Sequence, residues 1–109
     1  MKEIKFEDWQ KLDLRIGEIK EAKDHPNADK LLVLKVDIGN EIRTVVAGIK
    51  KFYSKEDLIG RKIVLFTNLD QKELRGIKSE GMILAAEGSD EKIVLLAPEK
   101  DIDIGAKIR

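Results

Sequence analysis

The fold is decided by one stretch, residues 32–47, which reads LVLKVDIGNEIRTVVA. Its first half is apolar at every second position, as a strand with one buried face is. Gly39 and Asn40 then tolerate the positive φ angles of a tight turn, and residues 42–47 resume an extended pattern. We therefore predict a β-hairpin at the centre of the fold.

Strand signals continue on both sides of this hairpin. Before it, alternation begins at Leu14, and the apolar phase slips across Gly17, which predicts a bulge or a sharp bend there. After it, residues 63–66 and 82–86 are short apolar runs of strand length. The pattern indicates five strands in all.

A short helix is predicted between the third and fourth strands. Ser54 and Asp57 match a capping box, Leu58 supplies an apolar contact, and Gly60 can end the turn. Five strands with a helix at this point describe an OB-fold, a partly open five-stranded Greek-key barrel of the all-β class.

Both ends of the chain add to that barrel. Residues 6–12 space Phe6 and Trp9 as a short amphipathic helix would, and residues 93–96 and 104–108 resemble extra strands. No linker or repeat interrupts the sequence. We predict a single domain over residues 1–109.

Composition limits the range of functions. The chain has 21 basic and 21 acidic residues, so any nucleic-acid site must be a local patch. It has no cysteine, which excludes disulfides, thiolate zinc sites and cysteine nucleophiles. No apolar run approaches the ~20 residues of a membrane helix. The charged N-terminus does not resemble a signal peptide, so we expect no membrane association and a cytoplasmic protein.

Catalytic and metal chemistry have little support. His25 is the one histidine, and a lone loop histidine is usually structural. Ser79 lacks the sequence of a nucleophile elbow, and Asp101 and Asp103 lack the rest of a calcium loop. We expect no enzyme activity, no cofactor and no metal.

Two connections between strands carry candidate binding residues. Residues 24–31 join the first two strands and residues 72–82 join the last two, the positions from which OB-folds contact oligonucleotides. The second connection contains Lys72, Arg75 and Lys78. The first is also rich in ordinary turn formers, and acidic residues dilute the second, so a purely structural reading stays open at this point.

Four segments together carry a family resemblance: DLRIG (13–17), HPNADKL (25–31), RTVVAGI (43–49) and LRGIKSEGMILAA (74–86). They resemble the tRNA-binding domain appended to methionyl-tRNA synthetases. The same domain occurs as a free-standing bacterial tRNA-binding protein and in C-terminal modules of eukaryotic synthetase-associated factors. The resemblance covers residues 6–109 and implies a domain that binds tRNA by shape.

The resemblance also implies partners. Because the sequence contains no catalytic body, it looks like the separate β-type subunit of methionyl-tRNA synthetase or a free-standing version, with tRNA and the synthetase's catalytic subunit as partners. A homodimer is implied, with the N-terminal helix (residues 1–12) and the C-terminal strands (residues 87–109) meeting a second copy. The alternative is an export chaperone of similar architecture, which residues 75–82 resemble less closely.

The expected tRNA-contacting residues are Asn27, Lys30, Arg43, Lys72, Arg75, Lys78, Ser79 and Met82. The loop cations are expected to contact phosphates, and Asn27 and Ser79 to hydrogen-bond sugar or phosphate oxygens. Arg43 is expected near them on the third strand. Met82 is expected to give an apolar contact to a base or ribose. Two structural alternatives stay open: Met82 fills the barrel, and Asn27 only shapes its turn.

Overall fold

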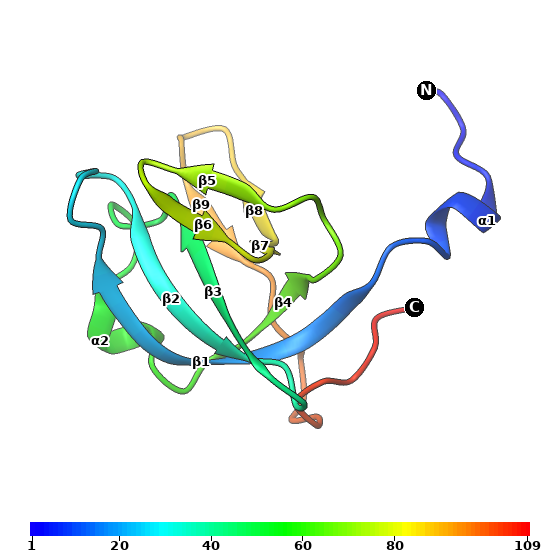
Figure 1. Ribbon diagram of the computed structural model, residues 1–109. Coiled ribbons are helices and arrows are strands. Elements are labelled where there is room, and N and C mark those ends of the chain that lie inside the picture. Colours follow the sequence, from blue (N-terminus) through cyan, green and yellow to red (C-terminus); the bar gives the residue numbers. More distant parts are fainter.

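The computed structural model describes all of residues 1–109, and a curled antiparallel sheet forms its body (Figure 1). The strand order is β3-β2-β1-β4-β7. In chain order these strands are β1 (Leu14–Asp24), β2 (Leu32–Asp37), β3 (Ile42–Ala47), β4 (Lys62–Phe66) and β7 (Met82–Ile83). The predicted five-stranded barrel of the OB type is confirmed.

The barrel is nearly closed where β3 meets the chain just before β7. The backbone N–H of Glu80 donates to the carbonyl of Thr44 at 2.7 Å, and the N–H of Thr44 donates to the Glu80 carboxylate at 2.7 Å. One step further along β3, the N–H of Val46 donates to Ser79 Oγ at 2.9 Å. Side chains therefore take the place of a regular ladder at this seam.

The core lies against the face of β2 that the sequence predicted. Leu32, Leu34 and Val36 have no exposed surface, and the hairpin with β3 runs in unbroken register from Leu32 opposite Ala47. Burying an aliphatic side chain of this size stabilises the fold by ~1.5–3 kcal/mol. The β2–β3 hairpin thus forms the packed base of the barrel, from which the loops extend.

The bend in β1 differs in part from its prediction. Gly17 is buried, and a Cβ there would lie 2.5 Å from Val36 Cγ1, so glycine allows β1 to pack closely against β2 at this position. The register shift, however, lies between Ile19 and Glu21. Just before this shift, Ile19 stands opposite Val36 on β2 while both of its backbone groups bond toward the start of β4: its N–H donates to the Arg61 carbonyl, and its carbonyl accepts from the Gly60 N–H.

The predicted helix between the third and fourth strands is confirmed as α2 (Lys55–Leu58). Ser54 caps it by accepting a hydrogen bond from the N–H of Asp57 at 3.3 Å, and Leu58 is fully buried. Gly60 follows at φ +87°, which a residue with a side chain rarely adopts.

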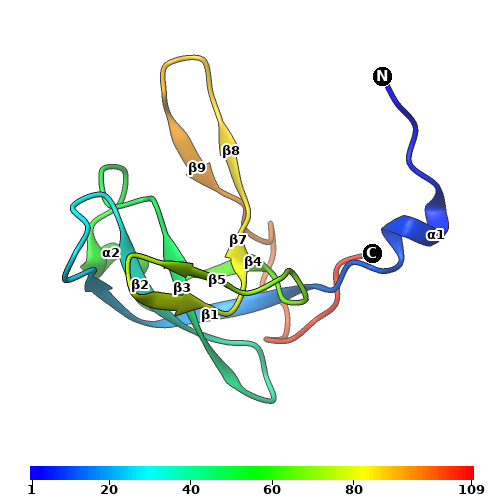
Figure 2. The same ribbon diagram turned by 45° about the horizontal axis from the view of Figure 1, so that its top comes forward.

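The C-terminal part departs from the prediction of one strand over residues 82–86. β7 ends at Ile83, and β8 (Ala85–Glu87) pairs with β9 (Ile93–Leu95) in a ribbon that projects from the barrel (Figure 2). The chain changes partner at Leu84, whose N–H bonds to Val64 on β4 while its carbonyl accepts from Leu96.

Residues 104–108 were predicted as a strand and form only one bridge, between Arg15 and Lys107. They still follow β1, because the Gly105 N–H donates to the Ile16 carbonyl at 2.7 Å and the Ile16 N–H donates to the Ala106 carbonyl at 2.9 Å. Gly105 adopts φ +89°, and this turn prevents a regular ladder.

The N-terminal helix is shorter than predicted. α1 (Phe6–Trp9) is a single turn, extended by a hydrogen bond from the N–H of Leu12 to Trp9. It stands away from the barrel beside the C-terminus (Figures 1 and 2), and none of its residues is buried. An isolated turn of this length has little stability of its own.

Candidate nucleic-acid interface

The connection between β4 and β7 is a hairpin rather than the loop expected from the sequence. β5 (Lys72–Leu74) pairs with β6 (Ile77–Ser79), and the two residues between them, Arg75 and Gly76, have φ angles of +55° and +95°. Two successive positive φ angles are those of a type I′ turn. Arginine is unusual at such a position, where a non-glycine residue costs ~1–2 kcal/mol. The turn therefore holds the Arg75 side chain at the exposed tip.

The tip of this hairpin lies beside the loop between β1 and β2 (Figures 1 and 2). Two direct contacts join them across about half the chain. His25 Nε2 lies 2.9 Å from the carbonyl oxygen of Leu74, and Arg75 Nε donates to the carbonyl of Asn27 at 3.3 Å. The two connections predicted to bind are thus adjacent.

Four of the cations predicted to contact tRNA lie on these two connections, and their side chains are exposed: Lys30, Lys72, Arg75 and Lys78. None of them forms an ion pair in the structure. Lys50 and Lys55 differ, because both pair with Asp24, at 3.3 Å and 3.0 Å. The hydrogen bond from Lys55, followed by that from Lys50, holds the pKa of Asp24 below its usual value. We name Lys30, Lys72, Arg75 and Lys78, together with Asn27, the loop-end surface.

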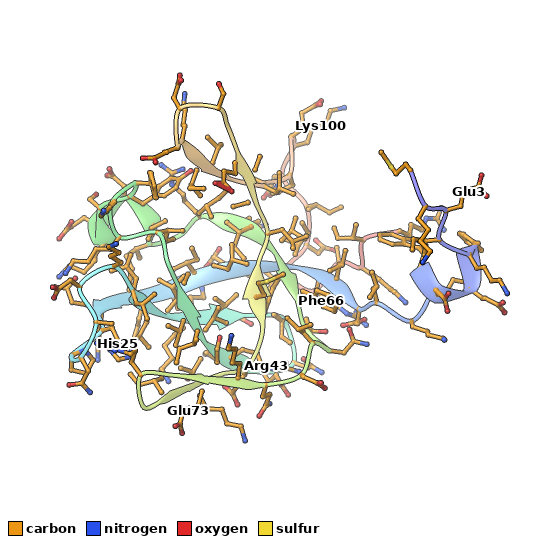
Figure 3. All side chains as sticks on the ribbon, turned by 90° about the horizontal axis from the view of Figure 1, so that it is seen from above. Glu3, His25, Arg43, Phe66, Glu73 and Lys100 are labelled. Atoms are coloured by element: carbon orange, nitrogen blue, oxygen red, sulfur yellow. The ribbon has the colours of Figure 1, made fainter.

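The structure does not bring Arg43 together with this surface. Arg43 stands opposite Val36, whereas the β1–β2 loop meets the other end of β3 at Ala47. Figure 3 shows Arg43 well apart from His25. Its Nη1 donates to the carbonyls of Thr67 and Glu80, each at 2.9 Å, and its Nε pairs with Glu41. Arg43 therefore ties β3 to its neighbours.

A polar hollow of about 390 Å³ lies beside Arg43 at the same end of the barrel. Arg15 and Asp13 line it and pair with each other at 3.0 Å. The hydrogen bond from the Arg15 guanidinium lowers the pKa of the Asp13 carboxyl. Its charged groups are thus already neutralised by one another.

Ser79 is placed inside the protein. Its side chain is 5% exposed, and its hydroxyl accepts from the Val46 N–H at 2.9 Å and donates to the Gly81 carbonyl at 2.8 Å. Both of its hydrogen-bonding functions are used at the barrel seam. The role that the structure supports for Ser79 is closing the barrel, so it does not belong to the loop-end surface.

Replacing Ser79 with alanine is expected to lower the free energy of unfolding by ~1–3 kcal/mol, because the buried Val46 N–H loses its acceptor. Chemical denaturation of the Ser79→Ala variant tests this. A free energy within ~0.5 kcal/mol of the wild-type value would show that Ser79 does not support the seam.

Met82 lies at the surface of the protein rather than inside the barrel. It is 43% exposed and stands opposite Phe66 on the last strand of the sheet. With Leu69, which is 41% exposed, it lines a mostly apolar hollow of about 110 Å³ that Lys72 also borders. Met82 therefore does not fill the barrel. Leu69 was missed because it follows β4 in a segment without periodicity.

A second surface lies at the opposite end of the molecule. Phe6 is 70% exposed, and with Trp9 and Leu12 it faces Ile108 across a hollow of about 480 Å³. The residues of α1 and of the C-terminal segment are thus neighbours, and their apolar side chains are partly open to solvent. We name Phe6, Trp9, Leu12 and Ile108 the terminal apolar surface.

Two further features bear on the chemistry. No three His, Asp or Glu side chains gather in an arrangement that could hold a metal ion. None of the helices has the length and apolar character needed to cross a membrane.

Comparisons with known proteins agree on one family. A family model described as "Putative tRNA binding domain" matches residues 14–107. A methionine–tRNA ligase of Thermococcus onnurineus is 58% identical over 106 residues, 97% of this chain. The chain spans only 14% of that enzyme's length, and 14–17% of the length of other methionine–tRNA ligases that it matches.

Two solved structures extend the comparison over the whole fold. A methionyl-tRNA synthetase-related protein from Pyrococcus horikoshii has a TM-score of 0.93 at 33% identity, with all of both chains covered. The chaperone CsaA of Bacillus anthracis has a TM-score of 0.89 at 36% identity, covering 99% of this chain and all of its own. The family match over residues 14–107, together with these relatives, shows that the chain belongs to the tRNA-binding domain family.

Proposed function

We propose that the protein binds tRNA through its loop-end surface and itself catalyses nothing. One observation carries this proposal: four exposed cations without ion pairs stand on two connections that contact each other directly. Fixed cations of this kind suit phosphate oxygens, which position a nucleic acid without reading its sequence. Asn27 and Met82 adjoin the cations and add a polar and an apolar contact.

Recognition by shape is the mode that fits this surface. Structured RNA presents phosphates and 2′-hydroxyls in a fixed arrangement, and a rigid patch recognises such an arrangement more readily than base identity. The protein as a whole has no net charge, so a long-range electrostatic field contributes little. Many tRNA species are therefore expected to bind with modest discrimination.

The affinity for tRNA is expected to fall as salt rises, with a shallow log-log slope of about −2 to −5, because only a few phosphates are neutralised. Gel shifts with several tRNAs over a range of salt concentrations measure this slope. A hairpin RNA and duplex DNA of similar length serve as controls. An affinity that is independent of salt, or equal binding to duplex DNA, contradicts the mechanism.

We further propose that the protein acts in trans, as the β-type subunit or an auxiliary of methionyl-tRNA synthetase in the cytoplasm. The support is that methionine–tRNA ligases contain a segment that is 48–58% identical to this chain. A separate tRNA-binding chain would raise the tRNA affinity of an associated enzyme by adding a second contact. Aminoacylation by the synthetase at limiting tRNA, with and without the protein, tests this role.

A homodimer is the proposed assembly. The terminal apolar surface supports it, because Phe6 and Trp9 belong to a helix without a buried residue, and covering such side chains is favourable. Two loop-end surfaces on one rigid body would then engage a single tRNA.

A second candidate function is binding of unfolded polypeptide. The similarity to CsaA, whose structure is described as a chaperone, favours it, as do the exposed apolar residues Leu69 and Met82. Titration with tRNA and with an unfolded polypeptide separates the two functions. We expect tRNA to bind more tightly, and tighter binding of the polypeptide would favour the chaperone.

A further inference from the structure

We propose that His25 is a positioning residue, which locks the β1–β2 loop to the β5–β6 hairpin and so fixes the spacing of the cations on the loop-end surface. This inference rests on the proposed tRNA binding for its functional consequence. The contact by which His25 joins the loop to the hairpin is a property of the protein without RNA and can be tested separately.

The contacts of His25 are unlike those of a side chain that only fills space. The ring is 5% exposed, although its neighbours Pro26 and Asn27 are exposed. Each of its two nitrogens has a partner: Nδ1 accepts from the N–H of Asn27 at 3.0 Å, and Nε2 lies 2.9 Å from the Leu74 carbonyl. One partner belongs to its own loop and the other to the hairpin.

These partners assign the tautomer. Because Nδ1 accepts a hydrogen bond from a backbone N–H, it carries no proton, and the ring proton is on Nε2, which donates to Leu74. The neutral imidazole is thus an acceptor toward one connection and a donor toward the other. Its ring is long enough to span the gap between them.

The position of the lock explains its expected effect. Leu74 is the last residue of β5, immediately before Arg75 at the tip, and Asn27 lies three residues before Lys30. Arg75 adds the only other direct hydrogen bond between the two connections, at the longer distance of 3.3 Å and from an exposed side chain. Without the buried contact, the hairpin and the loop would have to be ordered during binding, which weakens affinity.

Replacing His25 with asparagine separates the lock from turn formation. An asparagine side chain can accept from the N–H two residues ahead, as in an Asx-turn, so the contact with Asn27 is kept. It is too short to reach Leu74. The matched control is Tyr53→Phe, which removes another long-range hydrogen bond, from the Leu95 N–H on β9 to the Tyr53 hydroxyl at 3.0 Å, and this bond involves neither of the two binding connections.

We expect His25→Asn to bind tRNA roughly fivefold more weakly. This is the effect expected when one hydrogen bond that orders the binding surface before tRNA arrives is lost. Tyr53→Phe is expected to bind like the wild type, although both variants unfold somewhat more easily. In the protein without RNA, amide hydrogen exchange over residues 72–79 is expected to speed up in His25→Asn and to stay unchanged in Tyr53→Phe. Nitrogen NMR of the His25 ring is expected to show the proton on Nε2.

The inference is overturned if hairpin exchange in His25→Asn matches that of the wild type, or if the ring proton is found on Nδ1. It is also overturned if His25→Asn binds tRNA as tightly as the wild type does. A wild-type protein that binds no tRNA would refute the proposed function instead. In that case the exchange comparison still decides whether the lock exists.

Discussion

Replacing Lys72, Arg75 and Lys78 together with alanine is expected to weaken tRNA binding by about 3 kcal/mol or more, from about 1 kcal/mol for each lost phosphate contact. The three side chains are exposed and form no ion pair, and the one hydrogen bond among them, from Arg75 to the Asn27 carbonyl, is long and exposed, so the free energy of unfolding should change by less than ~0.5 kcal/mol. Filter binding at one fixed salt concentration, together with thermal unfolding, measures both quantities.

The control for this variant has the same change in charge. Lys92, Lys100 and Lys107 are equally exposed and lie in the C-terminal part of the chain. Their replacement with alanine is expected to change tRNA affinity little, once sedimentation has shown that both triple variants keep the wild-type assembly. If the control weakens binding as much as the hairpin variant does, the interaction is diffuse electrostatics and the loop-end surface is not the site.

The second large effect is expected from the terminal apolar surface. Replacing Phe6 with aspartate puts a charge where we expect a second copy to pack, and burying an unpaired charge is strongly unfavourable. The variant should be a monomer at micromolar concentration, where the wild type is a dimer. Losing the second contact should also weaken tRNA binding by about tenfold or more. Light scattering and sedimentation measure the assembly.

Ile59→Asp is the matched control, because Ile59 is an exposed aliphatic side chain at the end of α2, at 49% exposure. It is expected to remain a dimer with normal tRNA affinity. A wild-type protein that sediments as a monomer at micromolar concentration would refute the homodimer, whatever the variants do.

Local signals in the sequence predicted the base of the barrel. The alternation from Leu32 to Ile38 and the capping pair Ser54 and Asp57 each determine their own element, because the period and the cap act over a few residues. The sequence predicted that β1 contains a bulge or bend, but it placed this irregularity at Gly17 instead of between Ile19 and Glu21. Next to this register shift, Ile19 bonds to Gly60 and Arg61, which lie about forty residues away and which local sequence signals do not reveal.

The candidate site was predicted less completely, since its geometry depends on distant partners. Ser79 belongs to a segment rich in cations, so the sequence suggests that it lies at the surface. Its burial depends on the hydrogen bond with Val46, which is distant in the sequence. Similarly, the sequence marks His25 as structural but cannot name Leu74, its partner 49 residues away. The hairpin turn at Arg75 was missed because arginine is not a usual residue for that turn.

Mapping the tRNA contacts by NMR on the isotope-labelled protein tests the central claim most directly. The account predicts that added tRNA shifts or broadens backbone amide signals chiefly in residues 25–31 and 72–79, and that the hairpin triple variant loses these changes. The largest changes in α1 and residues 93–109, or no changes at any tRNA concentration at low salt, would contradict it.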